Sequence, residues 1–176
     1  MNFYPYLAID IPKKANGLIA ADKTTLASFW KAAETSLEPG VPEAIGCYIF
    51  SIKAGPGELP WYVGMAGKQS FRKECFTPHK IQHYNNAIAA RRGSPRLTLL
   101  AKYTPGLKFV KPTSARQRDV EELETLLIAN ALSRNPDLLN VRDTKLLREM
   151  VVPGLLNTPP GQPNAAVKRF KSLLGL

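Results

Sequence analysis

Apolar residues recur at helical spacing between Asp22 and Leu37, within a segment that is otherwise largely polar. A repeat of this kind places one apolar stripe along a helix, and the Pro39-Gly40 pair that follows can end it. The stripe consists of Leu26, Phe29, Trp30, Ala33 and Leu37. The pattern therefore predicts one helix before the first strand.

Two apolar runs follow that are short and rich in aromatic and β-branched residues. They cover residues 44–52 and 61–65, and the residues between them include Gly-Pro-Gly, which is typical of a turn. A third run of the same character covers 96–103. These runs predict a β-hairpin and a third strand.

Further helices are expected around the third strand. A short helix can begin after Ser70, and a second covers about 78–92. The strongest helical pattern covers 116–133, and a last helix can begin after Asn164. Short antiparallel strands with helices packed on them predict an α+β fold, with a small antiparallel sheet of about three strands flanked by helices.

The expected elements divide the chain into three parts. Residues 1–43 form an N-terminal accessory segment with one helix, and residues 44–145 form the domain that contains the sheet. Residues 146–176 form a C-terminal loop and helix, which we expect to pack on the core because the last helix has an apolar side.

The net charge of +10 indicates which kind of partner the protein could bind. Between Lys68 and Arg118 there are twelve lysines and arginines and one acid, Glu74. Such a segment attracts polyanions, above all the backbone of nucleic acids. The charge therefore favours a nucleic-acid partner, and the alternative is a basic surface that is merely solvated.

The same composition limits where the protein can act. No apolar stretch approaches the roughly 18 residues that a membrane-spanning helix needs, and the N-terminus lacks the pattern of a signal peptide. Cys47 and Cys75 are the only cysteines. We expect a cytoplasmic protein that makes no membrane contact and whose two cysteines are free thiols.

Glu124 is the most informative acid of the sequence. Its helical neighbours Val120, Leu127, Ile128 and Ala131 are apolar, so its carboxylate lies on the side of the helix that faces the core. A lone buried carboxylate is costly unless a cation or a metal ion holds it. Glu124 is therefore a candidate metal ligand, and the alternative is a rim position paired with a lysine or arginine.

Two tyrosines of the hairpin lie close to glycines. Tyr48 follows Gly46 by two residues, and Gly64 follows Tyr62 by two. A glycine in a strand often marks the close approach of a ligand or of another backbone. Arg72, ten residues after Tyr62, lies near a helix start and could hold a phosphate with its planar guanidinium.

Taken in order, these residues resemble the motifs of the GIY-YIG nuclease family. Gly46-Cys47-Tyr48 resembles the first tripeptide, with Cys in place of Ile, and Tyr62-Val63-Gly64 resembles the second, with Val in place of Ile. Arg72, the Glu-x-x-Leu-Ile sequence that begins at Glu124, and Asn140 follow in the family's order. The ordered set is more specific than either tripeptide.

The resemblance implies a metal-dependent endonuclease that cleaves phosphodiester bonds of DNA. Glu124 would hold one divalent ion, Mg²⁺ or Mn²⁺, which would stabilise the leaving oxygen. Tyr62 or Tyr48 would help to deprotonate the attacking water. Arg72 would bind the scissile phosphate, and Asn140 would hold the site together by hydrogen bonds.

The resemblance and the basic charge also suggest substrate contacts. Gly64 would keep the backbone close to the substrate. Lys68 lies near the position where many family members carry a lysine, and His83 is a candidate phosphate contact. Arg91 and Arg92 are the expected contacts to the nucleic-acid backbone.

Two positions depart from the family's pattern. Phe76 stands where many members carry His or Tyr, and Met65 stands where many carry Lys. Phe76 cannot move a proton, so we expect His79, or else His83 or Tyr84, to supply that group. The departures favour an alternative in which the domain binds nucleic acid without cutting it.

Two other interpretations remain open. Cys75, His79 and His83 read C-x3-H-x3-H, which could supply three zinc ligands, although Pro78 interrupts the helix between the first two. The chain could also be a module whose basic face binds an acidic protein. Salt-dependent binding of DNA would separate that module from the nucleic-acid readings.

Overall fold

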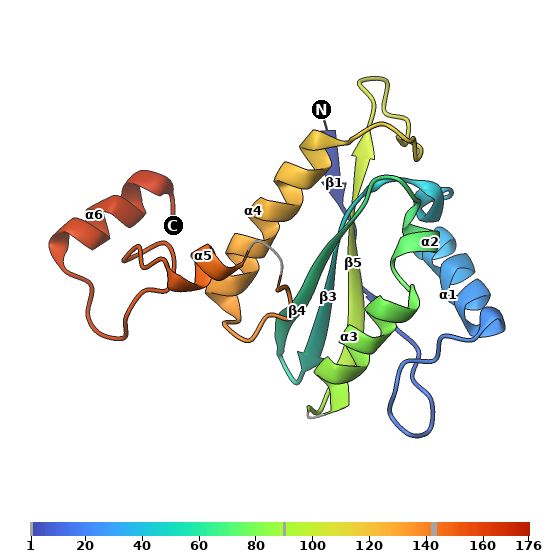
Figure 1. Cartoon of the computed structure of the whole chain (residues 1–176), viewed down its shortest axis with the longest axis horizontal. Helices are drawn as coiled ribbons and strands as arrows, with labels where there is room; N and C mark the ends of the chain where they lie inside the picture. The colour runs from blue at the N-terminus through green and yellow to red at the C-terminus, as the bar shows by residue number, and fades with distance from the viewer. Residues whose placement is uncertain (1, 90, 142–143) are drawn as a thin grey trace.

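The computed structural model describes residues 2–89, 91–141 and 144–176. The chain forms an open antiparallel sheet of five strands flanked by helices (Figure 1), which confirms the α+β class. The elements in chain order are β1 (Asn2–Pro5), β2 (Ile9–Asp10), α1 (Lys23–Ser36), the short 3₁₀ helix η1 (Val41–Glu43), β3 (Gly46–Ala54), β4 (Gly57–Ala66), α2 (Phe71–Glu74), α3 (Pro78–Ala89), β5 (Ser94–Tyr103), α4 (Arg118–Arg134), α5 (Lys145–Glu149) and α6 (Ala165–Leu174).

The sheet is larger than the expected three strands. Its order is β1-β5-β3-β4, and β2 also pairs with β5. The two added strands come from residues 2–10, so the N-terminal segment contributes strands to the sheet as well as the expected helix. Both strands are short, and Pro5 ends the first of them, so their sequence carries little strand signal. They form because β5 offers a free edge.

The hairpin of β3 and β4 carries both tyrosines of the motif-like tripeptides. Its turn is tighter than expected: β3 reaches Ala54 and β4 begins at Gly57, and Gly55 between them has a φ of 57°. The register shifts between Phe50 and Ser51, which places Trp61 in a bulge. Because β4 lies at the edge of the sheet, one side of its backbone pairs with no other strand of the described residues.

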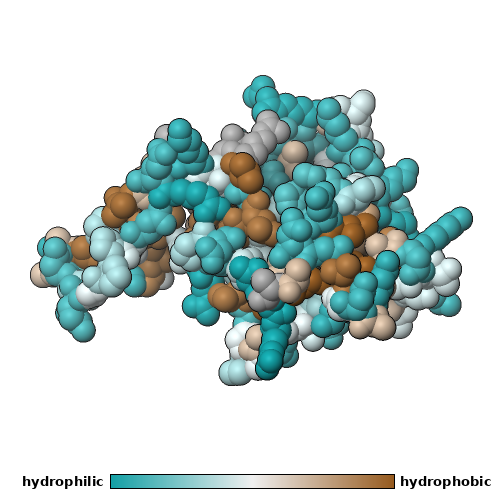
Figure 2. All heavy atoms as spheres, turned by 60° about the horizontal axis from the view of Figure 1, so that its bottom comes forward, coloured by the Kyte–Doolittle hydropathy of each residue, from teal (hydrophilic) through white to brown (hydrophobic). Residues whose placement is uncertain are grey.

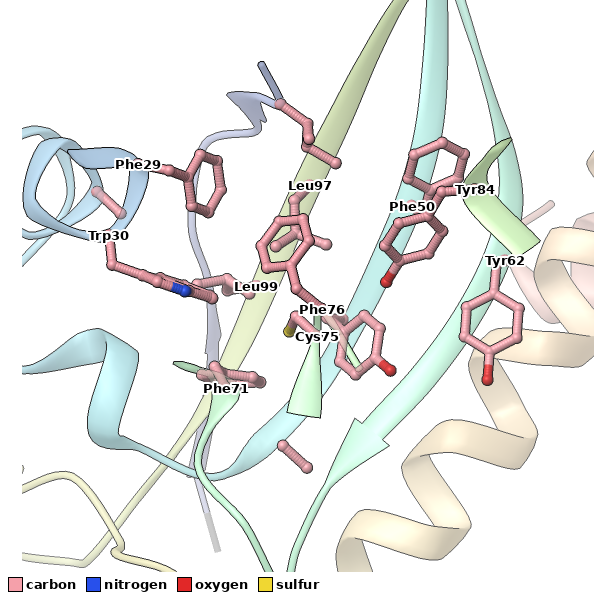
Figure 3. Packing of buried hydrophobic residues seen from close by; sticks show 14 of the residues in the cluster. Phe29, Trp30, Phe50, Tyr62, Phe71, Cys75, Phe76, Tyr84, Leu97 and Leu99 are labelled. Carbon is pink, nitrogen blue, oxygen red and sulfur yellow. The ribbon is translucent and has the colours of Figure 1, made fainter. Parts of the chain in front are cut away.

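Helices cover both faces of the sheet. The helices α1, α2 and α3 pack on one face and α4 on the other (Figure 1). Figure 3 shows the aromatic core of the first face, in which Phe29 and Trp30 of α1 lie edge-on to Phe76 and the rings of Phe50 and Tyr84 stack at 4.2 Å. Helix α1 of the N-terminal segment is therefore part of the main core.

The C-terminal helix packs differently from the expectation. Asn164 caps α6 by accepting a hydrogen bond from the N–H of Val167. However, no residue described in α6 is buried, and Figure 1 shows the helix beyond α5, away from the sheet. It rests on its own preceding loop, where a Cβ on Gly154 would lie 2.9 Å from side-chain atoms of Val167 and Lys171. The apolar side of the helix is thus only partly covered.

The surface view agrees with this arrangement. Figure 2 shows mainly hydrophilic side chains at the periphery of one face, with apolar groups near its middle and at the end that carries α6. At that end Leu155, Leu173 and Leu174 are exposed. Within the described ranges, no helix has the length and apolar character to cross a membrane.

Candidate active site

A cleft with a volume of about 650 Å³ opens at the edge of the sheet beside β4, between α3 and α4. Helix α3 lines it with His79, Lys80 and His83. Helix α4 lines the other side with residues that include Glu121, Glu124 and Thr125, and Tyr62 and Asn140 lie between the two helices. The cleft therefore collects Tyr62, His79, His83, Glu124 and Asn140 of the residues singled out in the sequence.

Asn140 completes the exposed edge of β4. Its side-chain oxygen accepts a hydrogen bond of 2.9 Å from the N–H of Val63, and its amide nitrogen donates one of 2.8 Å to the carbonyl of Val63. The N–H of Leu139 donates to the carbonyl of Trp61 in the same way. The side chain of Asn140 thus behaves like a partner strand and fixes the residue next to Tyr62.

Replacing Asn140 with Ala should destabilise the protein by about 2–3 kcal/mol, because two buried backbone groups of Val63 lose their partners. Urea unfolding measures this loss. Asn130→Ala is the matched control, since Asn130 is exposed on α4 and, among the described residues, its side chain donates only to the carbonyl of Leu126. Equal losses for the two variants would show that Asn140 does not hold the edge of the sheet.

Aromatic and cationic side chains surround Tyr62 in the cleft. Its hydroxyl accepts a close hydrogen bond from Nζ of Lys80, and that nitrogen also lies 4.7 Å from the centre of the ring. The ring of His83 stacks on Tyr62, with the ring centres 5.3 Å apart. Lys80 in turn lies 3.9 Å from a carboxylate oxygen of Glu74. A positive charge therefore sits at the phenolic oxygen.

Lys80 was missed by the sequence analysis. The family pattern directed attention to Met65 and the nearby Lys68, whereas the ammonium group that reaches Tyr62 comes from α3. The available signal was its position in the predicted helix, where Lys80 and His83 are three residues apart and so share a face.

The two histidines lie against each other in the cleft. They are four residues apart on α3, and their Nε2 atoms are 2.9 Å apart. The pKa of His83 is lowered below its usual value. Desolvation by burial is the largest cause, and the nearby His79 and Lys80 contribute less. His83 is therefore neutral at neutral pH and can accept a proton or a metal ion.

Tyr48 is not part of the cleft. It lies in the central strand β3, fully buried, and burial raises its pKa well above the usual value of a phenol. Its ring lies against Gly64, its partner across the hairpin: a Cβ on that glycine would be 2.4 Å from Cζ of Tyr48. Gly64 thus makes room for Tyr48, which by itself accounts for a glycine here, and the expected contact of its backbone with a substrate stays a prediction.

Arg72 also lies outside the cleft. Its Nε donates a close hydrogen bond to Glu43, and its Nη2 lies 3.7 Å from a carboxylate oxygen of Glu34. Both acids belong to the N-terminal segment, which the family resemblance does not cover. Arg72 therefore ties α2 to α1 and η1 through ion pairs, and its expected contact with a phosphate stays a prediction.

Glu124 is half-buried on α4 and faces the cleft together with Glu121, whose carboxylate lies 2.6 Å from Nη2 of Arg116. In the part of the chain that the structure describes, no three His, Cys, Asp or Glu side chains are grouped to hold a metal ion. Figure 3 shows Cys75 within the aromatic core, where it is fully buried, so it does not join His79 and His83 in a three-ligand zinc site.

The expected basic face is divided. Lys68 lines a smaller hollow of about 250 Å³ that adjoins the cleft. Arg91 stacks on Trp61, 3.5 Å from its ring centre, and Arg92 is exposed, but neither lines the cleft. Figure 1 places the end of α3, which precedes them, at the opposite end of the sheet from the turn after β5.

Several cations of the same segment serve the fold. Lys102 pairs with Asp119, and Arg96 pairs with Asp10 and Glu58. Because these charges are compensated inside the molecule, they add little to the attraction of a polyanion. The cations of residues 68–118 thus form separate groups, one of which borders the cleft, and the nucleic-acid face expected there stays a prediction.

Comparison with known proteins adds no relative to this description. The chain matches no protein-family model, no curated protein and no solved structure.

Proposed function

We propose that this protein is a metal-dependent endonuclease that cleaves DNA in the cleft between α3 and α4. The observation that carries the proposal is that the two sides of the cleft present different chemical groups. One wall presents the carboxylate of Glu124, and the other presents the hydroxyl of Tyr62 with the ammonium of Lys80 and two imidazoles. Such a cleft has places for a divalent cation, a phosphate and a proton acceptor.

The carboxylate wall suits Mg²⁺ or Mn²⁺. Mg²⁺ keeps several waters and is usually bound through one or two carboxylates and the phosphates of a substrate, so a cage of three protein ligands is not needed. Glu124 would hold the ion, with Glu121 beside it in the cleft. When bound, the ion supplies charge stabilisation for the leaving oxygen.

The opposite wall supplies proton acceptance and positive charge. The oxygen of water attacks phosphorus while its proton passes to the phenolate oxygen of Tyr62, or to an unprotonated ring nitrogen of His79, and the bond between phosphorus and the leaving oxygen breaks with its electron pair on that oxygen. Lys80 stabilises negative charge on the phenolic oxygen and on the phosphate, the part that the resemblance assigned to Arg72. Asn140 acts as a positioning residue, because it fixes the backbone next to Tyr62.

The second candidate is a domain of the same architecture that binds nucleic acid without cutting it. Three observations favour this alternative: Tyr48 is buried, Arg72 is paired outside the cleft, and the proton-carrying position of the family holds Phe76, a core residue. Lys80 and the histidines oppose it, because they supply equivalent groups from α3. The third candidate is a module whose basic face binds an acidic protein.

The deciding experiment incubates the full chain with supercoiled plasmid, linear duplex and single-stranded DNA, with Mg²⁺, Mn²⁺ or EDTA. We expect nicking that requires the metal ion and binding whose affinity falls steeply with salt. Salt-dependent binding without cleavage of any of these DNAs would support the non-cutting alternative. Absence of binding at low salt would overturn both nucleic-acid functions.

Arg72→Ala tests the revised position of this arginine. Because the ion pairs with Glu34 and Glu43 are partly exposed, we expect a loss of stability of no more than about 1 kcal/mol. Cleavage should change less than about threefold. Thermal unfolding and the nicking assay measure the two effects, with Glu43→Gln as the partner variant. If Arg72→Ala lowered cleavage a hundredfold and Glu43→Gln did not, the result would show that Arg72 contacts the phosphate.

A further inference from the structure

We propose that His79 and His83 form a chelating site for a divalent transition-metal ion, distinct from the carboxylate position that suits Mg²⁺, and that an ion bound there blocks the cleft. The two histidines occupy consecutive turns of α3 and face the same side. The binding of the ion does not rest on the proposed nuclease activity. Only its consequence for cleavage does.

The distance between the two nitrogens fits chelation. Nε2 of one ring donates the hydrogen bond that joins the pair, and an ion would replace that proton, which moves to Nδ1 or to water. An ion with bonds of about 2.05 Å to nitrogen and a ligand angle of about 90° places two nitrogens about 2.9 Å apart. The Nε2 atoms of His79 and His83 are 2.9 Å apart. Their ring centres are only 4.3 Å apart, too close for rings that point head to head across that gap, so the two nitrogens approach each other at an angle.

The geometry also ranks the ions. A right angle between two imidazoles is typical of Cu²⁺ and Ni²⁺, whereas tetrahedral Zn²⁺ needs the nitrogens to move to about 3.3 Å apart. Cu²⁺ also leads the general affinity order for nitrogen ligands. The described ranges contain no third His, Cys, Asp or Glu grouped with the pair, so water fills the remaining positions. We therefore expect Cu²⁺ to bind most tightly, then Ni²⁺ and Zn²⁺.

The surroundings permit the site and limit its affinity. His79 is exposed and His83 is partly exposed, so an ion can reach the pair from solvent. Lys80 opposes a second cation, but its ammonium is directed to Tyr62 and lies near Glu74. Lys80→Met should therefore strengthen binding of the metal ion.

An ion on this pair would lie next to the reacting groups. His83 stacks on the ring of Tyr62, and both line the cleft that also contains Glu124. A hydrated ion held on α3 would take the space in front of the phenol that water and phosphate need. Transition metals would then inhibit a reaction that Mg²⁺ supports, because the two kinds of ion choose different ligands: imidazole nitrogen in one case and carboxylate oxygen in the other.

The test is a calorimetric titration of the full chain with Cu²⁺ alone, followed by electron paramagnetic resonance of the complex. We expect one ion per chain and a spectrum with two nitrogen ligands. His79→Ala and His83→Ala should each weaken binding at least tenfold, whereas Gln82→Ala, on the same helix, should leave it unchanged. Binding that stays within threefold in either histidine variant, or a spectrum without nitrogen coupling, would overturn the site.

The consequence for the cleft has its own readout. In the nicking assay with Mg²⁺, Cu²⁺ should inhibit the unaltered protein with a midpoint that matches its binding constant. Undiminished cleavage at saturating Cu²⁺ would overturn the blockage and leave the site standing. If the protein cuts no DNA, the titration still decides whether the metal site exists, so failure of the proposed function and failure of this inference can be told apart.

Discussion

Replacing Glu124 with Gln should lower Mg²⁺-dependent cleavage of DNA by about a thousandfold or more. The amide keeps the size of the carboxylate but loses the charge that holds the ion. Stabilisation by a metal ion is worth several kcal/mol in the transition state, and each 1.4 kcal/mol or so is a factor of ten in rate. Binding of DNA should persist, because the cations around the cleft are unchanged.

The control for this variant lies on the same helix. Glu122 is exposed on α4 and does not line the cleft, so Glu122→Gln should leave cleavage within about twofold. A nicking assay at several Mg²⁺ concentrations, run beside thermal unfolding with and without Mg²⁺, separates loss of the ion from loss of the fold. A Glu124→Gln protein that unfolds more easily yet still cleaves would make Glu124 a structural partner of a cation and not a metal ligand.

Local patterns predicted the longer helices and the hairpin well, but not the short helices η1 and α5. The apolar stripe of α1, the turn signal between β3 and β4, and the long pattern of α4 each depend on neighbouring residues, and each element formed near the expected bounds. The strands β1 and β2 could not be read in this way. They are too short to show a repeat and exist only because β5 offers them hydrogen bonds from a distant part of the chain.

The site residues divide by a similar rule. The place of Glu124 in the cleft could be predicted, because the direction of a side chain on a helix follows from the helical repeat. Asn140 was singled out only by the family resemblance, because nothing in its local sequence predicts that its side chain bonds the edge strand. Tyr48 and Tyr62 could not be told apart, since both point to the same face of the sheet and both are largely buried. Only the strand order encloses Tyr48 completely and brings Tyr62 to the wall of the cleft. The ion pairs of Arg72 could not be predicted either, because its two acidic partners lie in the N-terminal segment, far from it in the sequence.

The second prediction with a large expected effect concerns Tyr62, which the strand order places beside the cleft. If its oxygen accepts the proton of the attacking water, Tyr62→Phe should lower kcat by about 10²–10⁴-fold, the usual contribution of a positioned acid or base. KM should change little, because Lys80 and the histidines that meet the phosphate remain. The fold should hold, since phenylalanine keeps the ring that packs beside His83 and Tyr84.

Tyr48→Phe is the matched control, because it removes the same atom from the neighbouring tyrosine, whose ring centre lies 6.3 Å away. The hydroxyl of Tyr48 is buried near that of Tyr84 and makes no well-formed hydrogen bond within the described ranges, so its removal should change stability by no more than about 1 kcal/mol. Cleavage should stay within about threefold. Steady-state kinetics of the two variants, with unfolding curves for both, decide between the tyrosines. A large loss in Tyr48→Phe with little change in Tyr62→Phe would move the chemistry from the open edge of the sheet to its buried centre, and the proposed cleft would no longer be the site of cleavage.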